Sequence, residues 1–569
     1  MRRRRYYVGL SIILILVFTF TIINSRHAVL GVEKGYAQAG DNGQWNALIS
    51  NNVNQDQSTS LVVDGRNMKA RYSDTMFLQN SPEYGLQWMV AVDSLTGVLE
   101  CYVGHYSPDT ILIQRAEKRL VIDTKNGEMN RNGEAISGYR AICRDGKWFI
   151  CTDLLADVFG YEAKWNPTQD ELDFSKTENT DMRIYPAAYD YRAEGRASEP
   201  KSQGRSAACW AYAATTCMET GILPEKKIAL DVDHMIRNNS YKLEPDNGGR
   251  NMISLAYLLA WQGPRECKEN IFADHDTDVV HLQEAHFLPG KDFNSIKEHV
   301  FLYGGVQSSI FMDSAGMYSD YYNREYNSYC YIGTEKINHD IVIIGWDDNY
   351  PKENFSNVPE ANGAFICMNS WGDTFGEDGC FYISYYDTNI GTYNTAYVGI
   401  EANDNYDFIY QTDLCGWIGQ MGYNDETAYF ANVYRTQTNE KVDAVGFYAL
   451  TENTNYEVYI QTGEIDYGKL KLDNMVASGS VEYSGYYTIE LDKPVIMNAN
   501  TEYAVIMKIT SPGTNMPIAI EFVSDQISSS ANVDITDGYG LISSKGIFWS
   551  NVESAQHSNV CLKAYTSAY

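Results

Sequence analysis

Positive charge and proline are both scarce in this sequence, and their scarcity excludes several classes of protein. The 569 residues include 44 Lys and Arg against 74 Asp and Glu, which leaves a net charge of -30. A surface this acidic repels phosphate backbones and anionic membranes, so nucleic acid is excluded as a partner. With 14 prolines and 13% aromatic residues, the chain is neither disordered nor fibrous. The composition therefore predicts packed, strand-rich domains, about three or four for this length.

The sequence also lacks a hydrophobic run long enough to span a bilayer. Its most apolar stretch, Val8–Ile23, is shorter than the roughly 20 residues of a membrane-spanning helix. It follows Arg2–Arg5, an order typical of an export signal, and Ala37–Ala39 has the small-x-small pattern of a cleavage site. Whether residues 1–39 are removed or kept as an anchor, the rest of the chain is expected outside the cell or at its surface. Membrane contact is then expected only through an uncleaved N-terminal segment.

No Cys-x-x-Cys pair and no cysteine–histidine cluster has zinc-finger spacing, so the sequence predicts no metal site and no required cofactor. The eleven cysteines are an odd number, so at least one thiol is unpaired. In an exported protein such a cysteine is a candidate reactive thiol. The acidic segment 403–407 offers oxygen ligands for calcium. Its spacing differs from that of an EF-hand loop, and a solvated loop is the preferred interpretation.

One cysteine lies in the most informative segment of the chain. Residues 203–212 read QGRSAACWAY, and helix-compatible residues follow until Gly221, which is predicted to end the helix. Cys209 is therefore expected at a helix N-terminus, where unpaired N–H groups and the helix dipole favour a thiolate. Gln203 can return its side-chain amide to the same place. Together with the backbone N–H of Cys209, this amide would stabilise a tetrahedral oxyanion.

A candidate base and its orienting group follow downstream. His339 precedes the apolar run Ile341–Ile344, and Asn369 follows a second short apolar run. An Asn carbonyl that accepts one ring N–H would fix the imidazole with its other nitrogen towards Cys209. Trp371 is placed to shield this hydrogen bond from water. The residues thus predict a nucleophile, a base and an orienting group for acyl transfer.

The pattern QGxxxxCW, then NH, then NSWG resembles the papain family of cysteine peptidases. His339 and Asn369 lie 130 and 160 residues after Cys209, close to the roughly 130–150 residues typical of such enzymes. The resemblance implies a catalytic domain at residues 184–400, with a helical lobe and a β-barrel-like lobe. It also implies the roles of nucleophile, base, orienting group and oxyanion donor for Cys209, His339, Asn369 and Gln203.

The same resemblance assigns the wall that binds the substrate backbone to Asn247, Gly248 and Gly249, although a plain turn also explains these residues. Trp371 completes the expected substrate-binding set. Ser206 stands where the family usually has a cysteine, so a common disulfide is missing and the stiffness of the loop before Cys209 is open.

Two further modules are predicted beside the catalytic domain. After a polar linker at 40–59, residues 60–175 are expected to form a small α+β module, with Thr152 capping a helix that ends before Gly160. Its end, where residues 159–166 read FGYEAKWN, resembles the stalk-like domain of some copper amine oxidases and bacterial surface proteins, which implies a spacer or wall-binding role. Residues 403–569 predict an all-β sandwich. In this architecture and in the sequence DNYDFIY at 404–410, they resemble the lectin-like domain of some clostridial cell-wall cysteine proteases, which implies cell-wall polymers or glycans as partners.

The overall prediction is an α+β protein that acts as a secreted or cell-surface cysteine endopeptidase on protein or peptide substrates. Residues 184–400 are expected to fold and cleave alone, and the C-terminal domain to localise the enzyme. Two alternatives stay open. One is a peptidoglycan-peptide hydrolase or transpeptidase with the same triad, and the other is a catalytically silent surface adhesin.

Overall fold

The computed structural model describes residues 60–63, 66–67, 76–81, 85–144, 146–166, 171–177, 182–241, 248–267, 279–523 and 533–569. The predicted export signal, the linker at 40–59 and Asn247 lie outside these residues. The chain divides into two units, one formed by Met1–Lys69 with Ala163–Ser175 and the other by Ala70–Glu162 with Lys176–Tyr569. Within the described residues, no helix is both long and apolar enough to cross a membrane.

The smaller unit is built on a four-stranded sheet. Its order is β12 (Tyr161–Asn166), β13 (Glu171–Lys176), β1 (Ser60–Val63) and β2 (Arg66–Asn67). Strands β1 and β13 run parallel, whereas β1 and β2 run antiparallel. Leu172 and Phe174 alternate with polar residues along β13 and are fully buried, as expected for a strand with one apolar face.

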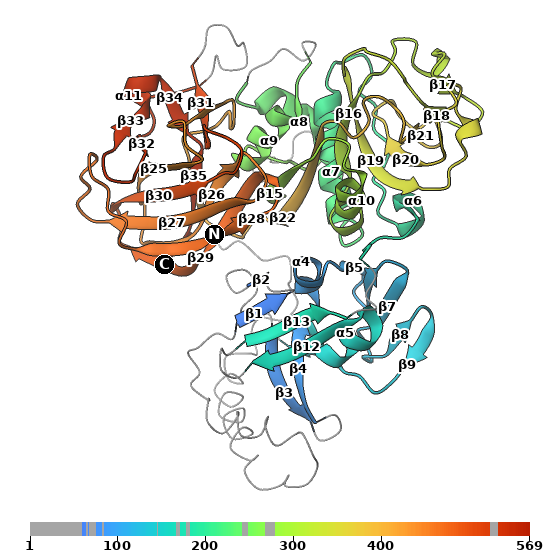
Figure 1. Ribbon diagram of the computed structural model, residues 1–569, viewed down its shortest axis with the longest axis horizontal. Helices are drawn as coiled ribbons and strands as arrows, with labels where there is room; N and C mark the ends of the chain where they lie inside the picture. The colour runs from blue at the N-terminus through green and yellow to red at the C-terminus, as the bar shows by residue number, and fades with distance from the viewer. Residues whose placement is uncertain are drawn as a thin grey trace. The chain divides into compact units, whose positions relative to one another are not determined.

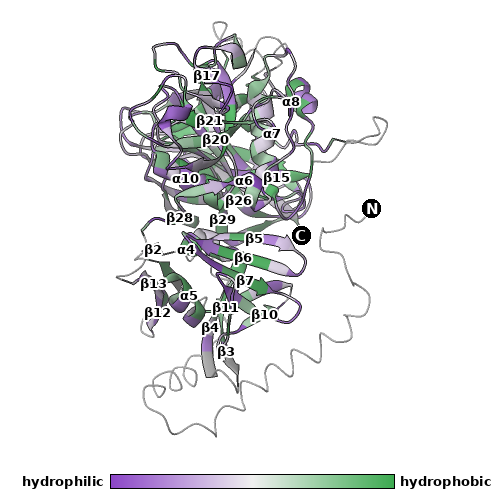
Figure 2. Ribbon diagram, turned by 90° about the vertical axis from the view of Figure 1, so that its right-hand side faces the viewer, coloured by the Kyte–Doolittle hydropathy of each residue, from purple (hydrophilic) through white to green (hydrophobic). Residues whose placement is uncertain are grey.

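The larger unit begins with two small antiparallel sheets. One has the order β10 (Ala141–Arg144), β11 (Lys147–Cys151), β4 (Gly85–Ala91) and β3 (Met76–Ser81). The other is a meander of β5 (Tyr102–Ser107), β6 (Thr110–Arg115), β7 (Lys118–Asp123), β8 (Met129–Arg131) and β9 (Glu134–Ile136). Figure 2 shows the hydrophobic colouring of β6, whose residues after Thr110 are buried.

A short helix, α5 (Thr152–Phe159), follows the first of these sheets. The helix ends at Gly160, which has a left-handed backbone conformation as the sequence predicts. The expected N-cap is wrong by one position, since Cys151 is the capping residue and no side chain accepts a cap hydrogen bond.

This N-terminal part packs onto the predicted catalytic domain, residues 184–400, through a buried arginine. The guanidinium carbon of Arg196 lies 4.3 Å from the ring centroid of Tyr102 on β5 and 4.4 Å from that of Tyr191. Arg196 also donates to the carbonyl of Phe301 over 2.8 Å. A buried guanidinium needs such acceptors and aromatic faces to offset its desolvation, so Tyr102 helps to complete the core of the catalytic domain.

The predicted catalytic domain combines helices with the strands at one end of a large sheet (Figure 1). Its helices are α6 (Tyr191–Glu194), α7 (Cys209–Ile222), α8 (Val232–Asn238), α9 (Asn251–Leu259) and α10 (Phe293–Leu302). Its strands are β14 (Ala188–Asp190), β15 (Val280–Leu288), β16 (Val306–Ile310), β17 (Tyr322–Asn323), β18 (Ser328–Tyr329), β19 (His339–Asp347), β20 (Ala364–Met368), β21 (Cys380–Ser384) and β22 (Asn394–Ala402).

Helix α7 is the central helix of this domain. Its buried positions are mostly small, including Ala211, Ala213 and Ala214, which allows close packing on β19 and β22. The helix does not end at Gly221 as expected, but continues to Ile222. A Cβ at Gly221 would lie 2.6 Å from a methyl of Ile400, so tertiary packing rather than termination requires this glycine.

The catalytic and C-terminal domains share one continuous sheet of 13 strands among the described residues. At the junction, β15 pairs on one side with β22 and on the other with β29 (Ser484–Met497) of the C-terminal domain. The ladder continues through β26 (Glu440–Ala449), β35 (Leu562–Ala568) and β23 (Phe408–Tyr410). Backbone hydrogen bonds between β15 and β29 therefore join the two domains directly.

The C-terminal domain is a β-sandwich, which confirms the predicted all-β architecture apart from the short helix α11 (Val552–Gln556). Its second sheet has the order β28 (Met475–Val481), β27 (Thr454–Thr462), β30 (Glu502–Thr510), β25 (Thr427–Arg435), β32 (Gly540–Ser543) and β33 (Ser550–Asn551). Strands β24 (Gly419–Met421), β31 (Ile518–Phe522) and β34 (Ser558–Val560) form a third, small sheet. Phe447, Val458 and Met507 from the facing sheets are fully buried in one core.

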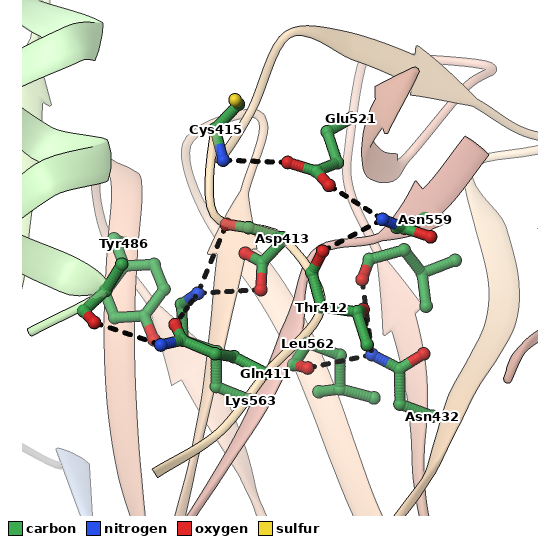
Figure 3. A network of polar contacts seen from close by, with 12 residues as sticks. Gln411, Thr412, Asp413, Cys415, Asn432, Tyr486, Glu521, Asn559, Leu562 and Lys563 are labelled. Carbon is green, nitrogen blue, oxygen red and sulfur yellow. Dashed lines mark hydrogen bonds and ion pairs between the residues drawn. The ribbon is translucent and has the colours of Figure 1, made fainter. Parts of the chain in front are cut away.

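A buried polar network contacts residues 411–415, the segment that leads into this domain (Figure 3). Lys563 Nζ lies 2.7 Å from Oδ1 of Asp413, and both side chains are almost completely buried. Glu521 accepts the backbone N–H of Cys415 and the side-chain amide of Asn559, over 2.8 and 2.7 Å. Since the same segment accepts a hydrogen bond from Tyr241 of the catalytic domain, the network lies next to the interface between the domains.

Candidate active site

Cys209 is the first residue of α7, as the sequence predicts, and its side chain is partly exposed. No side chain caps this helix, so its first N–H groups point towards the thiol without a competing side-chain acceptor. Burial nevertheless raises the pKa of the Cys209 thiol to about 11, and the charge of Asp340 adds to the rise, while backbone N–H groups of Asp340 and Trp210 oppose it. The backbone N–H groups thus act in the direction that the sequence predicts, against the effect of burial.

His339 is the first residue of β19 and is buried. Its Nε2 atom lies 2.8 Å from Oδ1 of Asn369. That oxygen also accepts the backbone N–H of Ser370 over 2.8 Å, which fixes the amide orientation. Nε2 must then carry the proton, and Nδ1 is the free basic nitrogen. Burial lowers the pKa of His339, whereas the Asn369 hydrogen bond and the charge of Asp340 raise it.

Asn369 and Trp371 surround the other side of the imidazole. Asn369 directly follows β20, which pairs with β19, and its backbone N–H donates to the carbonyl of Gly379 over 2.9 Å. The ring of Trp371 has its centroid 5.2 Å from that of His339. The indole thus packs against the imidazole, and the shielding of the hydrogen bond by Trp371 stays a prediction.

Gln203 is tied to the segment that follows Asn369. Its backbone N–H donates to the carbonyl of Ser370 over 2.8 Å, and its Oε1 accepts from the Ser370 hydroxyl. One N–H of its amide donates to the carbonyl of Ser206 over 2.7 Å. An amide has a second N–H, which leaves Gln203 one donor for an oxyanion.

Hydrogen bonds replace the missing disulfide in the loop before the nucleophile. Both the N–H and the hydroxyl of Ser206 donate to the carbonyl of Gln203, over 3.1 and 2.8 Å. These two hydrogen bonds constrain the loop whose stiffness the sequence left open. All eleven cysteines are described and none forms a disulfide; Cys143 and Cys267 are exposed.

The glycine-rich segment lies beside the nucleophile. A Cβ at Gly249 would lie 2.4 Å from Nε1 of Trp210, the residue after Cys209, so only glycine fits there. Gly248 has a φ of +73° and faces Ala207. Asn247, the third member of the predicted wall, lies outside the described residues.

Three polar residues next to the site were not predicted from the sequence: Asp340, Gln307 and Ser309. Asp340 accepts from Nε2 of Gln307 over 2.9 Å and from the hydroxyl of Ser309 over 2.6 Å. Gln307 also donates weakly to the carbonyl of Trp210, over 3.4 Å. An acidic residue between the candidate base and the apolar run at 341–344 was the available signal, because a charged side chain in such a position requires a partner.

Within the described residues, no group of three or more His, Cys, Asp or Glu side chains could hold a metal ion. In the candidate calcium segment, Oδ1 of Asn405 contacts Nδ1 of His281 over 2.7 Å, and Asp407 accepts the backbone N–H of Ala568 over 2.9 Å. These oxygens therefore have protein partners, and calcium at 403–407 stays the less favoured of the two interpretations.

Comparisons with known proteins agree with this arrangement. Residues 185–400 match the family model of the papain family cysteine proteases, and residues 409–566 match that of the lectin like domain. These segments are therefore a papain-family cysteine protease domain and a lectin-like domain. This relationship supports a cysteine-type peptidase and confirms the predicted α+β fold with its all-β C-terminal domain.

Two curated relatives show how far the sequence similarity extends. A viral cathepsin of Heliothis zea nuclear polyhedrosis virus is 28% identical over 209 residues, which cover 35% of this chain and 52% of the relative. Cathepsin F of Drosophila melanogaster is 25% identical over 223 residues, which cover 36% of this chain and 34% of the relative. The chain thus spans about half, or less, of the length of these relatives.

Solved structures extend the similarity beyond the protease domain. The clostridial cysteine protease Cwp84 after propeptide cleavage is 25% identical, with a TM-score of 0.59 over 67% of this chain and 99% of that one. The protease and lectin-like domains of Cwp84, a surface layer associated protein of Clostridium difficile, share the fold with a TM-score of 0.57 at 23% identity, over 67% and 89% of the two chains.

Proposed function

We propose that this chain is a secreted or cell-surface cysteine endopeptidase. The catalytic triad is Cys209, His339 and Asn369, and Gln203 donates to the oxyanion. The observation that carries the proposal is the 2.8 Å contact between His339 and Asn369, because it leaves Nδ1 of His339 as the base in a site that begins at the N-terminus of α7.

The mechanism follows from these atoms. Sγ of Cys209 attacks the peptide carbonyl while its proton passes to Nδ1 of His339. The backbone N–H of Cys209 and the free amide N–H of Gln203 stabilise the oxyanion. His339 then returns the proton to the leaving amine, which leaves a thioester. Water attacks the thioester with His339 as base, and hydrolysis restores the thiol. No cofactor takes part.

Hydrolysis of a random peptide library, read by mass spectrometry, tests this proposal. The full chain should cleave internal peptide bonds, and Cys209→Ala should be inactive. Cys267→Ala removes an exposed thiol and is the matched control, which should keep full activity. Cleavage that survives in Cys209→Ala would contradict the assignment.

Substrate choice separates the two alternatives from the endopeptidase. A peptidoglycan-peptide hydrolase should release stem peptides from purified cell wall and leave casein intact. A silent adhesin should cleave neither substrate, and alkylation of Cys209 should leave its adhesion unchanged. The complete constellation around Cys209 favours a working enzyme.

The lectin-like domain is proposed to hold the enzyme on a wall glycan. A cavity of about 530 Å³ in this domain is lined by several tyrosines, Arg435, Glu502 and Asp537. The rings of Tyr467 and Tyr539 lie 4.4 Å apart, and Arg435 pairs with Glu502 over 2.9 Å. Aromatic faces with a few polar groups suit a sugar ring.

Retention on purified wall polysaccharide tests the glycan proposal. Tyr539→Ala should reduce retention and leave hydrolysis of a short soluble peptide unchanged. Equal retention of the variant would contradict it. Export by the N-terminal segment and a spacer role for residues 60–175 complete the proposal; the first rests on the signal-like sequence and the second on the resemblance to stalk domains.

A further inference from the structure

Three buried polar side chains are joined by hydrogen bonds at the junction between the protease and lectin-like domains. They are Glu284 and His286 of β15 and His299 of α10, and each is at most 6% exposed. Strand β15 pairs with β29 of the lectin-like domain through residues 284–287 and 484–487. Glu284 and His286 lie on the same face of this short segment, since they are two positions apart. The peptidase mechanism uses none of the three side chains.

The hydrogen bonds form one series from the helix to the strand. Nδ1 of His299 lies 2.7 Å from the carbonyl oxygen of Ser295, one turn earlier in α10. Nε2 of His299 lies 2.9 Å from Nδ1 of His286. Nε2 of His286 lies 2.8 Å from Oε1 of Glu284. All four ring nitrogens of the two histidines therefore take part in the series.

The number of protons in the series follows from its fixed end. A carbonyl oxygen only accepts, so Nδ1 of His299 carries a proton. Burial, followed by the charge of His286, lowers the pKa of His299 to about 3, so this ring is neutral and its Nε2 accepts from Nδ1 of His286. A neutral His286 would then have no proton on Nε2, and this lone pair would face the carboxylate of Glu284. All three hydrogen bonds exist together only when one further proton lies between His286 and Glu284.

Two tyrosines of the lectin-like domain cover the histidine pair. The ring of Tyr483 stacks on that of His286, with centroids 5.2 Å apart, and meets the ring of His299 edge-on at 4.9 Å. Tyr487 lies opposite Glu284 in the pairing of β15 and β29, and its ring centroid is 5.3 Å from that of His286. The series is thus closed on one side by the catalytic domain and on the other by the lectin-like domain.

The surrounding charges support a cation at this place. On β22 the residue opposite His286 is Ala396, which cannot titrate. At the end of α10, Tyr303 faces His299 with ring centroids 5.5 Å apart. Three acidic side chains act on the neighbouring Tyr483: Glu482, Glu298 and Asp292. Negative charges favour a doubly protonated imidazole, as do hydrogen bonds from both of its nitrogens, whereas burial opposes it.

We propose that Glu284, His286 and His299 form a proton-dependent latch between the two domains, in which the imidazolium of His286 holds β15 against β29 and loss of its proton releases this pairing. Without that proton one hydrogen bond is lost, and two acceptors face each other in the protein interior, which is costly. An ordinary histidine loses its second proton near pH 6.5, so the opened junction does not rebind it above this value. The contribution of the latch is therefore fully present below about pH 6.5 and decreases as pH rises.

Glu284→Gln in the full chain is the direct test. Its amide N–H can donate to Nε2 of a neutral His286, which completes the three hydrogen bonds without the further proton. Hydrogen exchange at residues 284–287 and 484–487, corrected for intrinsic rates and read by mass spectrometry, reports how often the pairing opens. Between pH 7 and pH 9, opening in the unmodified chain should increase about tenfold per pH unit, because each opening releases one proton. In Glu284→Gln it should change less than about twofold over the whole interval.

The ring nitrogens of His286 provide a second readout, which a merely structural contact would not change. In the ¹⁵N spectrum of the histidine-labelled full chain at pH 7.5, both nitrogens of His286 should carry a proton. In Glu284→Gln only one of them should. The His286→Gln variant identifies the signal among those of the nine histidines.

Glu490→Gln is the matched control. It removes an exposed carboxylate from β29 outside the series, so it should keep the pH dependence of the unmodified chain. If Glu284→Gln does not fold, His299→Leu is the second test. Without the acceptor on His299, a neutral His286 can donate to Glu284, so opening should depend on pH less than in the unmodified chain. Thermal unfolding of each variant shows whether it is folded.

Three results would overturn the latch. They are opening that is independent of pH in the unmodified chain, an unchanged pH dependence in a folded Glu284→Gln or His299→Leu variant, and a singly protonated His286 in the unmodified chain at pH 7.5. None of these measurements requires turnover, so their outcome is independent of the proposed peptidase activity.

Discussion

Nε2 of His339, the first residue of β19, lies 2.8 Å from Oδ1 of Asn369, the residue that follows β20. The register that pairs Val342 with Met368 brings the start of β19 next to the residue after β20. The Ser370 N–H prevents the amide from turning its nitrogen to the imidazole. Backbone pairing therefore selects both the tautomer and the direction of the base.

Asn369→Ala should weaken hydrolysis without abolishing it. The nucleophile and base remain, but the imidazole loses the acceptor that orients it. We expect kcat to fall by about 10²-fold, with little change in KM. Steady-state kinetics on a peptide cut by the full chain measures this. Asn349→Ala, at an exposed position after β19, is the control and should keep full activity. Complete inactivity of folded Asn369→Ala would show that Asn369 does more than orient His339.

Gln203→Glu should remove the oxyanion donor while preserving the size of the side chain. We expect kcat to fall by about 10²- to 10³-fold, since the lost N–H acts on the developing negative charge. A peptide aldehyde, which forms a tetrahedral adduct with the thiol, should bind more weakly by a similar factor. Ser206→Ala loosens the same loop and keeps the donor, so it should lose much less activity. Equal losses in both variants would assign Gln203 to loop stiffness alone.

Local sequence signals predicted the places of the reacting residues in the fold. Cys209 begins α7, His339 begins β19 and Asn369 follows β20. These places could be predicted because each depends only on a polar residue next to a helix or an apolar run. Gly221 misled the prediction of the helix end, since its cause is the close approach of Ile400 from β22. Nothing in the local sequence reveals that contact.

Long-range pairing was the part that the sequence could not supply. The partners of Asp340 are known only when β16 and β19 are in register. In the same way, the strand order that places β15 beside β29 depends on residues about 200 positions apart.

A chain that ends at residue 402 should aggregate or unfold at a lower temperature than the full chain. Removal of the C-terminal domain would expose the edge of β15 at residues 284–287, which pair with 484–487 of β29. Tyr448 and Tyr486, both buried in the core shared with the catalytic domain, would also be lost. Light scattering and thermal unfolding measure the outcome. A monomeric fragment with unchanged stability and peptidase activity would support the independent catalytic domain that the sequence predicts.

Glu521→Gln should change how stability depends on pH. Glu521 is buried on β31, and burial, followed by the nearby Asp413, raises the pKa of its carboxyl to about 8 (Figure 3). In the unfolded chain the pKa returns to its ordinary value near 4.5. Between these values the folded state keeps a proton that the unfolded state has lost. The contribution of Glu521 to stability is therefore fully present below about pH 4.5 and is lost as pH rises to about 8.

The glutamine cannot ionise, so its variant should not lose that contribution. We expect the Tm of Glu521→Gln relative to the unmodified chain to rise by a few degrees between pH 5 and pH 8.5, whatever the offset at pH 5 from altered hydrogen bonds. Glu457→Gln is the control in the same domain. The Lys508 hydrogen bond lowers the pKa of Glu457, so this residue is ionised in both states throughout the interval and its difference in Tm should be constant. A constant difference for Glu521→Gln as well would mean that Glu521 is ionised in the fold, with Lys563 neutralising both it and Asp413.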